Sequence, residues 1–521
     1  MMFPAEWLLP LVIALPLAAA LAMARLDRAR NRLPSMLAIA ASGLSLAGTI
    51  ALVPAVLAAG SLTWSLPALA GRFTLTADAI SMVFAVTGAL VWFCATLYAV
   101  AYLREDPGRK RFQMTSLVVL SANLGVVLAG ELLTLYASFE LLGLVALLLV
   151  IHDGSDTARR AGVKYFWMTL IGGFALLGGI LLVQTMAGSG TITPLPAGAG
   201  PPAMIHAAFV LLLIGFGVKA GMVPLHTWLP DAHPAAPAPA SALLSGVMIK
   251  AGAYGIFRML HVVFRPDGGS DSLTAWALNV RPGLIVLWLG IVTMLVGVVL
   301  ALGQHHAKRM LAWHSVSQMG FVLTGLGAGL WLGAEGAMGT AGGLLHVVNH
   351  ALFKACLFLG AGAVALHAGT ADMYRLGGLW RKMPVTFVCM LVAAAGITGI
   401  PLFNGFVSKC LIHHALVEGA GREGGGSLVV AEWIFLATCA GTVASFVKLI
   451  GLVFLRTPRQ GPARPVRDAA VPMSAAMVIL AVPIVVIGLR PHIVLEGLIV
   501  PGLDSFHIAA EPLGHYLEAY Y

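Results

Sequence analysis

The sequence predicts an all-α polytopic membrane protein of about fourteen transmembrane helices, judging from its composition and from the spacing of its apolar runs. Of the 521 residues, 59% are hydrophobic and 10% are charged, against roughly 25% charged in an average soluble domain. Runs of about 20 apolar residues, the length that a bilayer requires, follow one another from Trp7 to Arg490 without a long polar gap. A soluble fold could not bury so much apolar surface.

The apolar runs place the helices one after another in a single membrane domain, residues 1–521. The first run has no basic residue before it and no small-residue cleavage site, so we expect a true span rather than a signal peptide. The predicted spans are 5–24, 35–60, 78–102, 112–129, 132–151, 161–186, 205–224, 241–263, 283–303, 311–332, 338–366, 385–413, 431–455 and 471–489.

Basic residues in the loops predict the orientation. If the N-terminus faces outward, nineteen basic residues lie in cytoplasmic loops and five lie outside. The positive-inside rule therefore places both termini outside a bacterial-type inner (cell) membrane. Because the charges sit in short loops, the net charge of +9 indicates topology and not nucleic-acid binding. The five outward residues are Arg72, Arg265, Arg281, Arg422 and Arg490.

Seven basic residues fall inside predicted spans. Arg258 and Lys448 lie near span ends, where a long side chain can reach the surface. A lysine at mid-bilayer costs about 2.5–3.5 kcal/mol, so the other five need partners or water and are candidates for function. They are Lys164, Lys219, Lys250, Lys354 and Lys409.

Two predicted spans, the seventh and the twelfth, contain helix-breaking residues. Pro224 and Pro230 follow Lys219, and Pro401 interrupts the run that leads to Lys409. Proline removes a backbone donor and frees a carbonyl group, and broken helices in membranes often mark ion sites. A packing kink without an ion role is the alternative.

The sequence contains an internal repeat at an offset of 190 residues. The offset places Lys164 on Lys354 and Lys219 on Lys409, and the latter two lysines each end a GFxxK motif. Spans six and seven thereby map onto spans eleven and twelve. A shift of five helices reverses orientation, which is typical of the inverted repeats of ion-coupled carriers.

Glu140 is the single acid that we place inside a span. A buried lysine is costly when charged, so its proton affinity responds to its neighbours. We expect Glu140 to pair with a first-half lysine and to set its proton affinity; a static salt bridge is the alternative. At the offset of 190 residues, the position that corresponds to Glu140 is Leu330, so only the first half has this acid.

Span eleven carries His346, His350 and Lys354 at i, i+4 and i+8, on one helical face. Imidazole titrates near neutral pH, so this stripe suits a proton relay toward Lys409. Satisfied core histidines are one alternative. Bis-histidine haem ligation is less favoured, because no facing helix offers an obvious histidine. We interpret the histidines near span ends as gating or loop residues: His226, His233, His305, His306 and His314.

Other chemistry is not indicated. The five cysteines stand singly in apolar stretches, which argues against disulfides, iron–sulfur clusters and thiolate zinc sites. The sequence contains no phosphate-binding loop, nucleophile elbow or metal-ligand spacing. We therefore expect no cofactor and no metal site.

Three segments resemble signatures of the proton-conducting antiporter-like subunits. This family comprises the large membrane-arm subunits of respiratory complex I, the membrane subunits of membrane-bound hydrogenases and formate hydrogenlyase, and the large subunits of Mrp-type antiporters. The segments are 224–255, which begins Pro224-Leu225-His226-Thr227-Trp228-Leu229-Pro230-Asp231, then 308–320 (Lys308-Arg309-Met310-Leu311) and 349–354 (Asn349-His350-Ala351-Leu352-Phe353-Lys354).

The resemblance implies two inverted five-helix repeats with broken helices 7 and 12. It divides the chain into N-terminal helices 1–3 (1–110), a first repeat of helices 4–8 (111–263), a second repeat of helices 9–13 (282–456), helix 14 (470–490) and a short tail (491–521). It implies proton translocation through Glu140, Lys219, Lys250 and Lys409, with the helix-eleven histidines among His346 and His350. Lys164 and Lys354 become supporting residues.

Two departures narrow the resemblance. The middle antiporter-like subunit of complex I generally has glutamate where this chain has Lys409. The distal subunit of complex I carries a long lateral helix, and the residues that follow the last span here, about thirty, are too few to form it. The chain therefore resembles the compact members of hydrogenase-like, Mrp-like or complex I-like assemblies.

The expected function is that of a non-redox, proton-translocating subunit of an oxidoreductase complex. Its expected partners are other membrane subunits and a redox module, within the lipid bilayer. An Mrp-type cation/proton antiporter with small membrane subunits, carrying either protons alone or protons and sodium, is the alternative. An unrelated solute carrier is a third, which the lysine series and the family signatures disfavour.

Overall fold

The computed structural model describes residues 4–26, 32–68, 71–196, 198–265, 272–422, 424–457, 466–506, 508–510 and 513–514. Parts of the predicted loops 25–34 and 456–470 and of the tail 491–521 lie outside these ranges. The first half contains α1 (Leu8–Ala24), α2 (Leu33–Ala59), β1 (Ser61–Ala68), β2 (Gly71–Asp78), α3 (Ala79–Tyr102), α4 (Arg109–Val127), α5 (Leu132–Val150), α6 (Asp156–Ala187), α7 (Pro202–Ala220), α8 (Leu229–Ala235), α9 (Ala238–Leu243) and α10 (Ile249–Arg258).

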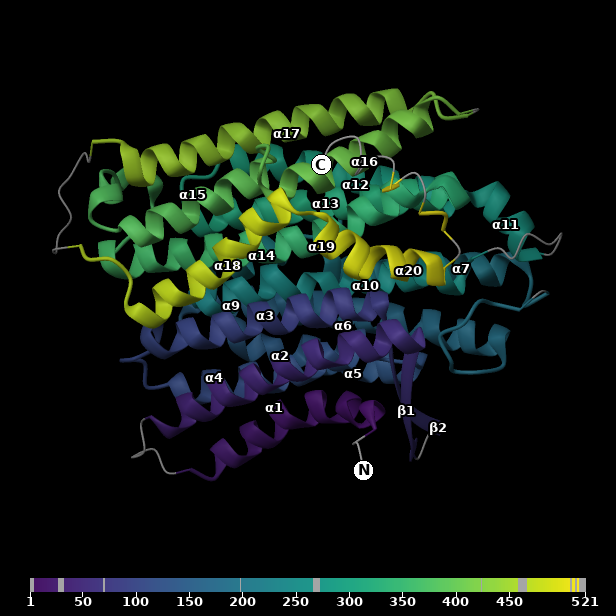
Figure 1. Ribbon diagram of the computed structural model, residues 1–521, viewed down its shortest axis with the longest axis horizontal. Helices are drawn as coiled ribbons and strands as arrows, with labels where there is room; N and C mark the ends of the chain where they lie inside the picture. The colour runs from purple at the N-terminus through teal and green to yellow at the C-terminus, as the bar shows by residue number, and fades with distance from the viewer. Residues whose placement is uncertain are drawn as a thin grey trace.

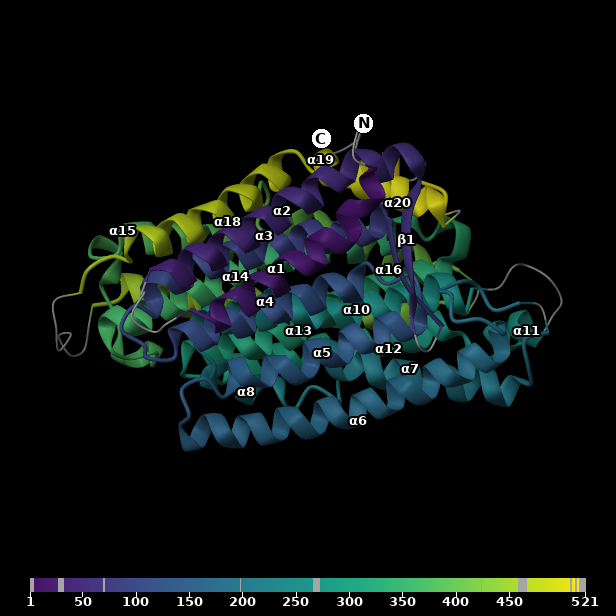
Figure 2. The same ribbon diagram turned by 90° about the horizontal axis from the view of Figure 1, so that it is seen from below.

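The second half contains α11 (Ser272–Val280), α12 (Pro282–Leu302), α13 (Ala307–Leu332), α14 (Ala337–Ala368), α15 (Pro384–Thr398), α16 (Asn404–Ala420), α17 (Leu428–Ile450), α18 (Val471–Leu489), α19 (His492–Val494) and α20 (Val500–Ser505). The long helices run side by side along the long axis, with α1 and α17 at opposite edges of the bundle (Figure 1). In the view from below, α6 lies at a further edge (Figure 2).

The prediction of an all-α polytopic membrane protein is confirmed. Twelve helical segments of the described chain are long and apolar enough to cross a membrane. The two other predicted spans also form helices. One is α4, whose first turn contains Arg109, Lys110 and Arg111, and the other is span twelve, which is divided into the shorter α15 and α16.

Glycines bring neighbouring helices into close contact at the centre of the bundle. A Cβ atom at Gly290 of α12 would lie 2.5 Å from the backbone nitrogen of Thr324, and one at Gly320 of α13 would lie 2.4 Å from that of Met294. Larger side chains at these glycines would therefore force α12 and α13 apart. Small residues of this kind let membrane helices pack backbone to backbone.

The β-hairpin between α2 and α3 was not predicted, because elements were assigned only to apolar runs long enough to cross a bilayer. Strands β1 and β2 pair antiparallel, with Ser61 opposite Asp78. The side chain of Asp78 then caps α3 by accepting a hydrogen bond from the Ser81 amide at 2.8 Å. The hairpin therefore sets the start of a central helix.

Both predicted helix breaks are present. Helix α7 ends at Ala220, before Gly221 with a positive φ of 69°, and α8 begins nine residues later. Helix α15 ends at Thr398, before Gly399 with a φ of 81°, and α16 begins at Asn404. Pro224 lies in the first connection, Pro401 in the second, and Pro230 in the first turn of α8. Glycine adopts these left-handed conformations without steric cost.

Candidate functional site

Five lysines were selected as candidates because a charge inside the bilayer is costly, and the structure buries four of them. Lys219, Lys250, Lys354 and Lys409 are all buried. Lys164 is not: its side chain is 43% exposed and forms an ion pair with Asp231 at 2.9 Å. Counting Lys164 among the enclosed lysines was wrong, because it lies on an outer face of α6.

Lys219 lies in the last turn of α7, where the helix breaks. Its ammonium group donates a hydrogen bond to the Tyr165 hydroxyl at 3.3 Å and lies 5.6 Å from the centre of the Phe139 ring. A cavity of about 10 Å³ adjoins it, which is room for about one water molecule. The lysine thus has one weak hydrogen-bond partner and access to water.

Glu140 lies on α5, near Lys219 but not in contact with it. Each of the two side chains acts electrostatically on the other, yet no ion pair within 4.0 Å joins them in the described structure. The Oε1 atom of Glu140 is buried without a hydrogen-bond partner, in space left by the absent side chain of Gly173. The arrangement therefore differs from a closed salt bridge, because the carboxyl group is held near Lys219 without a direct contact.

Lys250 lies on α10, directly after a π-helical segment, Leu244–Met248. Its ammonium group donates a 2.5 Å hydrogen bond to the Ser245 carbonyl oxygen, and a second cavity of about 10 Å³ adjoins it. Span eight was predicted as a regular helix. The π-segment instead turns a carbonyl group toward the lysine, and π-bulges are frequent at functional sites.

The predicted histidine stripe lies on α14, which is central in both views (Figures 1 and 2). His346 contacts the Ser408 hydroxyl at 2.9 Å and the Gln318 side-chain oxygen at 3.1 Å. His350 is buried with neither ring nitrogen hydrogen-bonded, and the two imidazole centroids are 6.3 Å apart. Lys354 donates a hydrogen bond to the Leu311 carbonyl oxygen.

Lys409 lies on α16 and contacts the end of the other half of its broken helix. Its ammonium group donates hydrogen bonds to the carbonyl oxygens of Ile397 at 2.8 Å and Thr398 at 3.3 Å. These are the last carbonyl groups of α15, where the helix dipole favours a positive charge. The ring of Phe321 lies 5.0 Å away.

Two further histidines belong to the buried series, although they were interpreted as gating or loop residues. His233 on α8 and His314 on α13 are fully buried, with no hydrogen bond to either ring nitrogen. Both lie within electrostatic range of Lys354. They were missed because α8 folds back into the protein and encloses residues that a hydropathy plot places at a span end.

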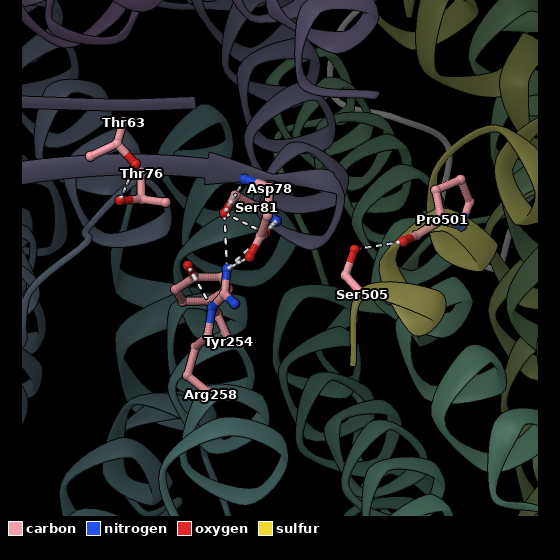
Figure 3. A network of polar contacts seen from close by, with 8 residues as sticks. All are labelled: Thr63, Thr76, Asp78, Ser81, Tyr254, Arg258, Pro501 and Ser505. Atoms are coloured by element: carbon pink, nitrogen blue, oxygen red, sulfur yellow. Dashed lines mark hydrogen bonds and ion pairs between the residues drawn. The ribbon is translucent and has the colours of Figure 1, made fainter. Parts of the chain in front are cut away.

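The position of Arg258 near a span end suggested that its side chain reaches the surface, but in the structure it does not. It is buried and forms a 2.7 Å ion pair with Asp78, while its Nε donates to the Tyr254 hydroxyl at 3.0 Å (Figure 3). Burial by itself raises the pKa of Asp78, but Arg258 and Ser81 outweigh it and hold the pKa below its usual value. The network ties α10, which carries Lys250, to the hairpin and α3.

Glu140 is not the single acid inside a span. Glu432 on α17 is part-buried and lies 3.1 Å from the Nε2 of His413 on α16. It was overlooked because it is the second residue of its predicted span. His413 is one helical turn from Lys409 on α16, so a second acid–base pair, between α16 and α17, lies near the second broken span.

Within the described residues, no three His, Cys, Asp or Glu side chains lie close enough together to hold a metal ion. The buried polar groups include lysines, histidines and hydroxyls on several helices. Such a series can bind, hold and pass protons, because each member has a protonated and a deprotonated form or can donate and accept hydrogen bonds.

Two family models match the chain and define its class. Residues 129–422 match the transmembrane family of NADH:quinone oxidoreductase and Mrp antiporters, and residues 65–113 match the N-terminal part of chain 5 of NADH-ubiquinone oxidoreductase (complex I). The chain therefore belongs to the NADH:quinone oxidoreductase/Mrp antiporter family of antiporter-like membrane proteins.

Particular relatives come from both branches. Hydrogenase-4 component B of Escherichia coli is 33% identical over 80% of this chain and 62% of its own length. A Na(+)/H(+) antiporter subunit of Alkalihalophilus pseudofirmus is 31% identical over 84% of this chain and 55% of its own length. The chain thus spans about three fifths of the length of these relatives.

A solved structure of a respiratory assembly has the same fold. A chain of the membrane-bound sulfane sulfur reductase, an archaeal respiratory membrane complex, superposes with a TM-score of 0.81 at 28% identity. The match covers 94% of this chain and 77% of that one. This chain is accordingly a multi-pass membrane protein whose structural relative works inside a multisubunit membrane complex.

Proposed function

We propose that this chain is the proton-translocating, antiporter-like subunit of a multisubunit respiratory complex of the NADH-quinone oxidoreductase or membrane-hydrogenase type. One observation carries the proposal: two buried lysines, Lys219 and Lys409, lie where two helices break, and buried titratable side chains lie between them. Intramembrane charges are costly and are kept for ion pathways.

Protons pass from Glu140 and Lys219 to Lys250, and then through His350 and His346 to Lys409. The electrostatic links support this order, because Lys250 acts on both histidines and Lys409 acts on His346. The one-water cavities beside Lys219 and Lys250 offer places for bridging water between groups that are not in direct contact.

Other described side chains extend this route. Lys354 supports the centre, since it lies within electrostatic range of Lys250 and His350. Lys164 acts at the surface, through Asp231. Residues 111–263 and 282–456 form the two inverted repeats, each with one broken helix.

Uphill transfer needs an external driver. Moving one charge against about 100 mV involves about 2.3 kcal/mol, and the lysines, histidines and carboxylates described for this route pass protons without supplying that free energy. We assign the driver to a partner redox module that is held by other membrane subunits. The chain itself lies in a bacterial-type cell membrane with both termini outside.

An Mrp-type antiporter is the second candidate, and the 31% identity to the Na(+)/H(+) antiporter relative favours it. In that case an opposing cation gradient replaces the redox module. The two candidates differ in their partners and in their dependence on sodium.

The test is to purify the native complex through a tag on this chain and to identify its subunits by mass spectrometry. Co-purification of quinone-reactive or nickel–iron subunits supports the redox pump, and small membrane subunits with sodium-dependent proton flux support the antiporter. Absence of proton movement in reconstituted vesicles under either driving force would contradict both. Cysteine labelling from each side of sealed vesicles tests the orientation.

A further inference from the structure

A cavity of about 510 Å³ opens at the end of the bundle that carries α11 and α20 (Figures 1 and 2). Its walls come from the segment after α10, from α11 and the start of α12, and from the turn between α13 and α14. The cavity therefore lies between the first and second halves of the chain. Its volume is in the range of ligand sites, about 300–1,000 Å³, and none of the residues discussed for proton transfer lines it.

The polar part of the lining is basic. Arg265, Arg281 and His261 line the cavity, and none of the described lining residues is acidic. The nearby carboxylate of Glu335 is taken up in an ion pair with Arg422, which is not a lining residue. Only five basic residues lie on the predicted outer side, and two of them, Arg265 and Arg281, line this one cavity.

Two of these groups are held in place and still have binding capacity. The Arg265 guanidinium donates a 2.5 Å hydrogen bond to the Phe506 carbonyl oxygen through one nitrogen, and the group carries five N–H donors in all. His261 is buried, and its Nε2 has no hydrogen-bond partner. An unpaired polar group at a buried wall is costly unless something binds it.

The rest of the lining is apolar and aromatic. Phe264, Trp331 and Phe506 form walls, and Leu278, which is 71% exposed, stands at the edge. A ligand that matches this cavity has a negatively charged head and an apolar body. Because the cavity is at the end of the helices, it lies at the level of the lipid headgroups, where tryptophan is enriched.

We propose that this cavity binds an anionic phospholipid, with its phosphate between Arg265 and Arg281 and its glycerol and upper acyl chain along the aromatic walls. Guanidinium groups bind phosphate in a bidentate, charge-assisted manner. The bound lipid contacts both halves of the chain and holds them together at this end.

The test uses the purified full chain in detergent, depleted of lipid, with dioleoyl phosphatidylglycerol and dioleoyl phosphatidylcholine as probes. Native mass spectrometry measures the bound lipid. Both lipids carry a phosphate, but the choline group of phosphatidylcholine adds a positive charge that the basic cavity repels. We therefore expect phosphatidylglycerol to bind about tenfold more tightly than phosphatidylcholine. Equal binding of the two lipids would overturn the proposal.

Arg281→Asn is the decisive variant. Arg281 has a left-handed φ of 52°, and asparagine accepts this conformation, so the change removes the charge and leaves the backbone unstrained. We expect the preference for phosphatidylglycerol to fall to about threefold or less. An unchanged preference would contradict the assignment.

The matched control is Arg490→Gln, which removes an exposed charge from the same predicted side but outside the cavity. It should leave the preference intact; an equal loss in both variants would show an effect of net charge only and would overturn the site. Inorganic phosphate at millimolar concentration should not displace the lipid, because it lacks the apolar body. Full displacement would identify the ligand as a free anion instead.

Discussion

Both broken helices carry a lysine beside the break but on opposite sides of it, because Lys219 lies at the end of α7 before the break and Lys409 lies in α16 after it. Lys219 has a carboxylate, Glu140, nearby without contact, and one hydrogen bond to Tyr165. Lys409 has two hydrogen bonds to carbonyl groups at the end of α15 and an aromatic ring. The first lysine is therefore balanced by a group that can itself gain a proton and move, and the second by fixed backbone dipoles.

This difference teaches that the internal repeat preserves a lysine beside a helix break, but neither the side of the break on which the lysine lies nor the groups that balance its charge. The helix break provides a helix terminus beside the lysine in both halves, and a small cavity adjoins Lys219 in the first. The counter-charge comes from other helices, and those differ between the halves. We infer that the protonation state of Glu140 sets the proton affinity of Lys219. Lys409, in contrast, holds its proton until the protonation state of His346 changes.

The largest expected effect is at the first half-site. Lys219→Ala and Glu140→Ala should each abolish coupled proton movement, a loss of about a hundredfold or more, because each removes a proton-transfer group. Dye-reported proton flux in vesicles containing the purified complex measures this. Gel filtration should show largely intact assembly. Normal flux in both variants would sink the proposed route.

Charge reversal separates the two half-sites. Lys409→Glu should retain flux within about tenfold, because a protonated carboxyl group can also donate to the carbonyl oxygens of Ile397 and Thr398. Lys219→Glu places a second carboxyl group near Glu140 and should lose about a hundredfold, as does Lys219→Ala. If both reversals have the same effect in the flux assay, the two sites are equivalent and the comparison fails.

Gly173→Ala tests the space that Glu140 occupies. An added Cβ would lie 2.4 Å from the Oε1 of Glu140, so the carboxyl group must shift while the backbone stays. We expect flux to fall about tenfold, less than for removal of the acid.

The control is Gly178→Ala on the same helix, where the added atom would meet only Leu211 Cδ1 at 3.4 Å. It should leave the flux unchanged, and thermal unfolding should be similar for the two variants. Equal flux in both would show that the position of the carboxyl group is unimportant.

The smallest expected effects come from removing single hydroxyl groups. Tyr165→Phe removes the hydrogen bond from Lys219 and the one that the hydroxyl donates to the Gly143 carbonyl oxygen. Ser408→Ala removes one of two contacts of His346 and a hydrogen bond from Asn349. A net hydrogen bond of about 1 kcal/mol corresponds to about a fivefold change. We expect Tyr165→Phe to have the larger effect on flux, because His346 keeps Gln318; the reverse order would show that the second half limits the rate.

The sequence by itself determined the membrane class, the spans, both helix breaks and the position of four lysines inside the helical bundle. These features depend on local properties: the length of an apolar run, the backbone limits of glycine and proline, and the cost of a charge at bilayer depth. Lys219, Lys250, Lys354 and Lys409 were found on cost alone, because no neighbour is needed to know that a buried charge is costly. Their roles in proton transfer stay predictions.

Tertiary structure decided which faces are enclosed and which distant residues meet. Lys164 lies inside a helix but on an outer face, whereas His233 and His314 lie near span ends yet are fully buried. Asp78 meets Arg258 across 180 residues of chain. Hydropathy along the chain reports the depth of a residue in the membrane but not its lateral neighbours, since these depend on how the helices pack against one another.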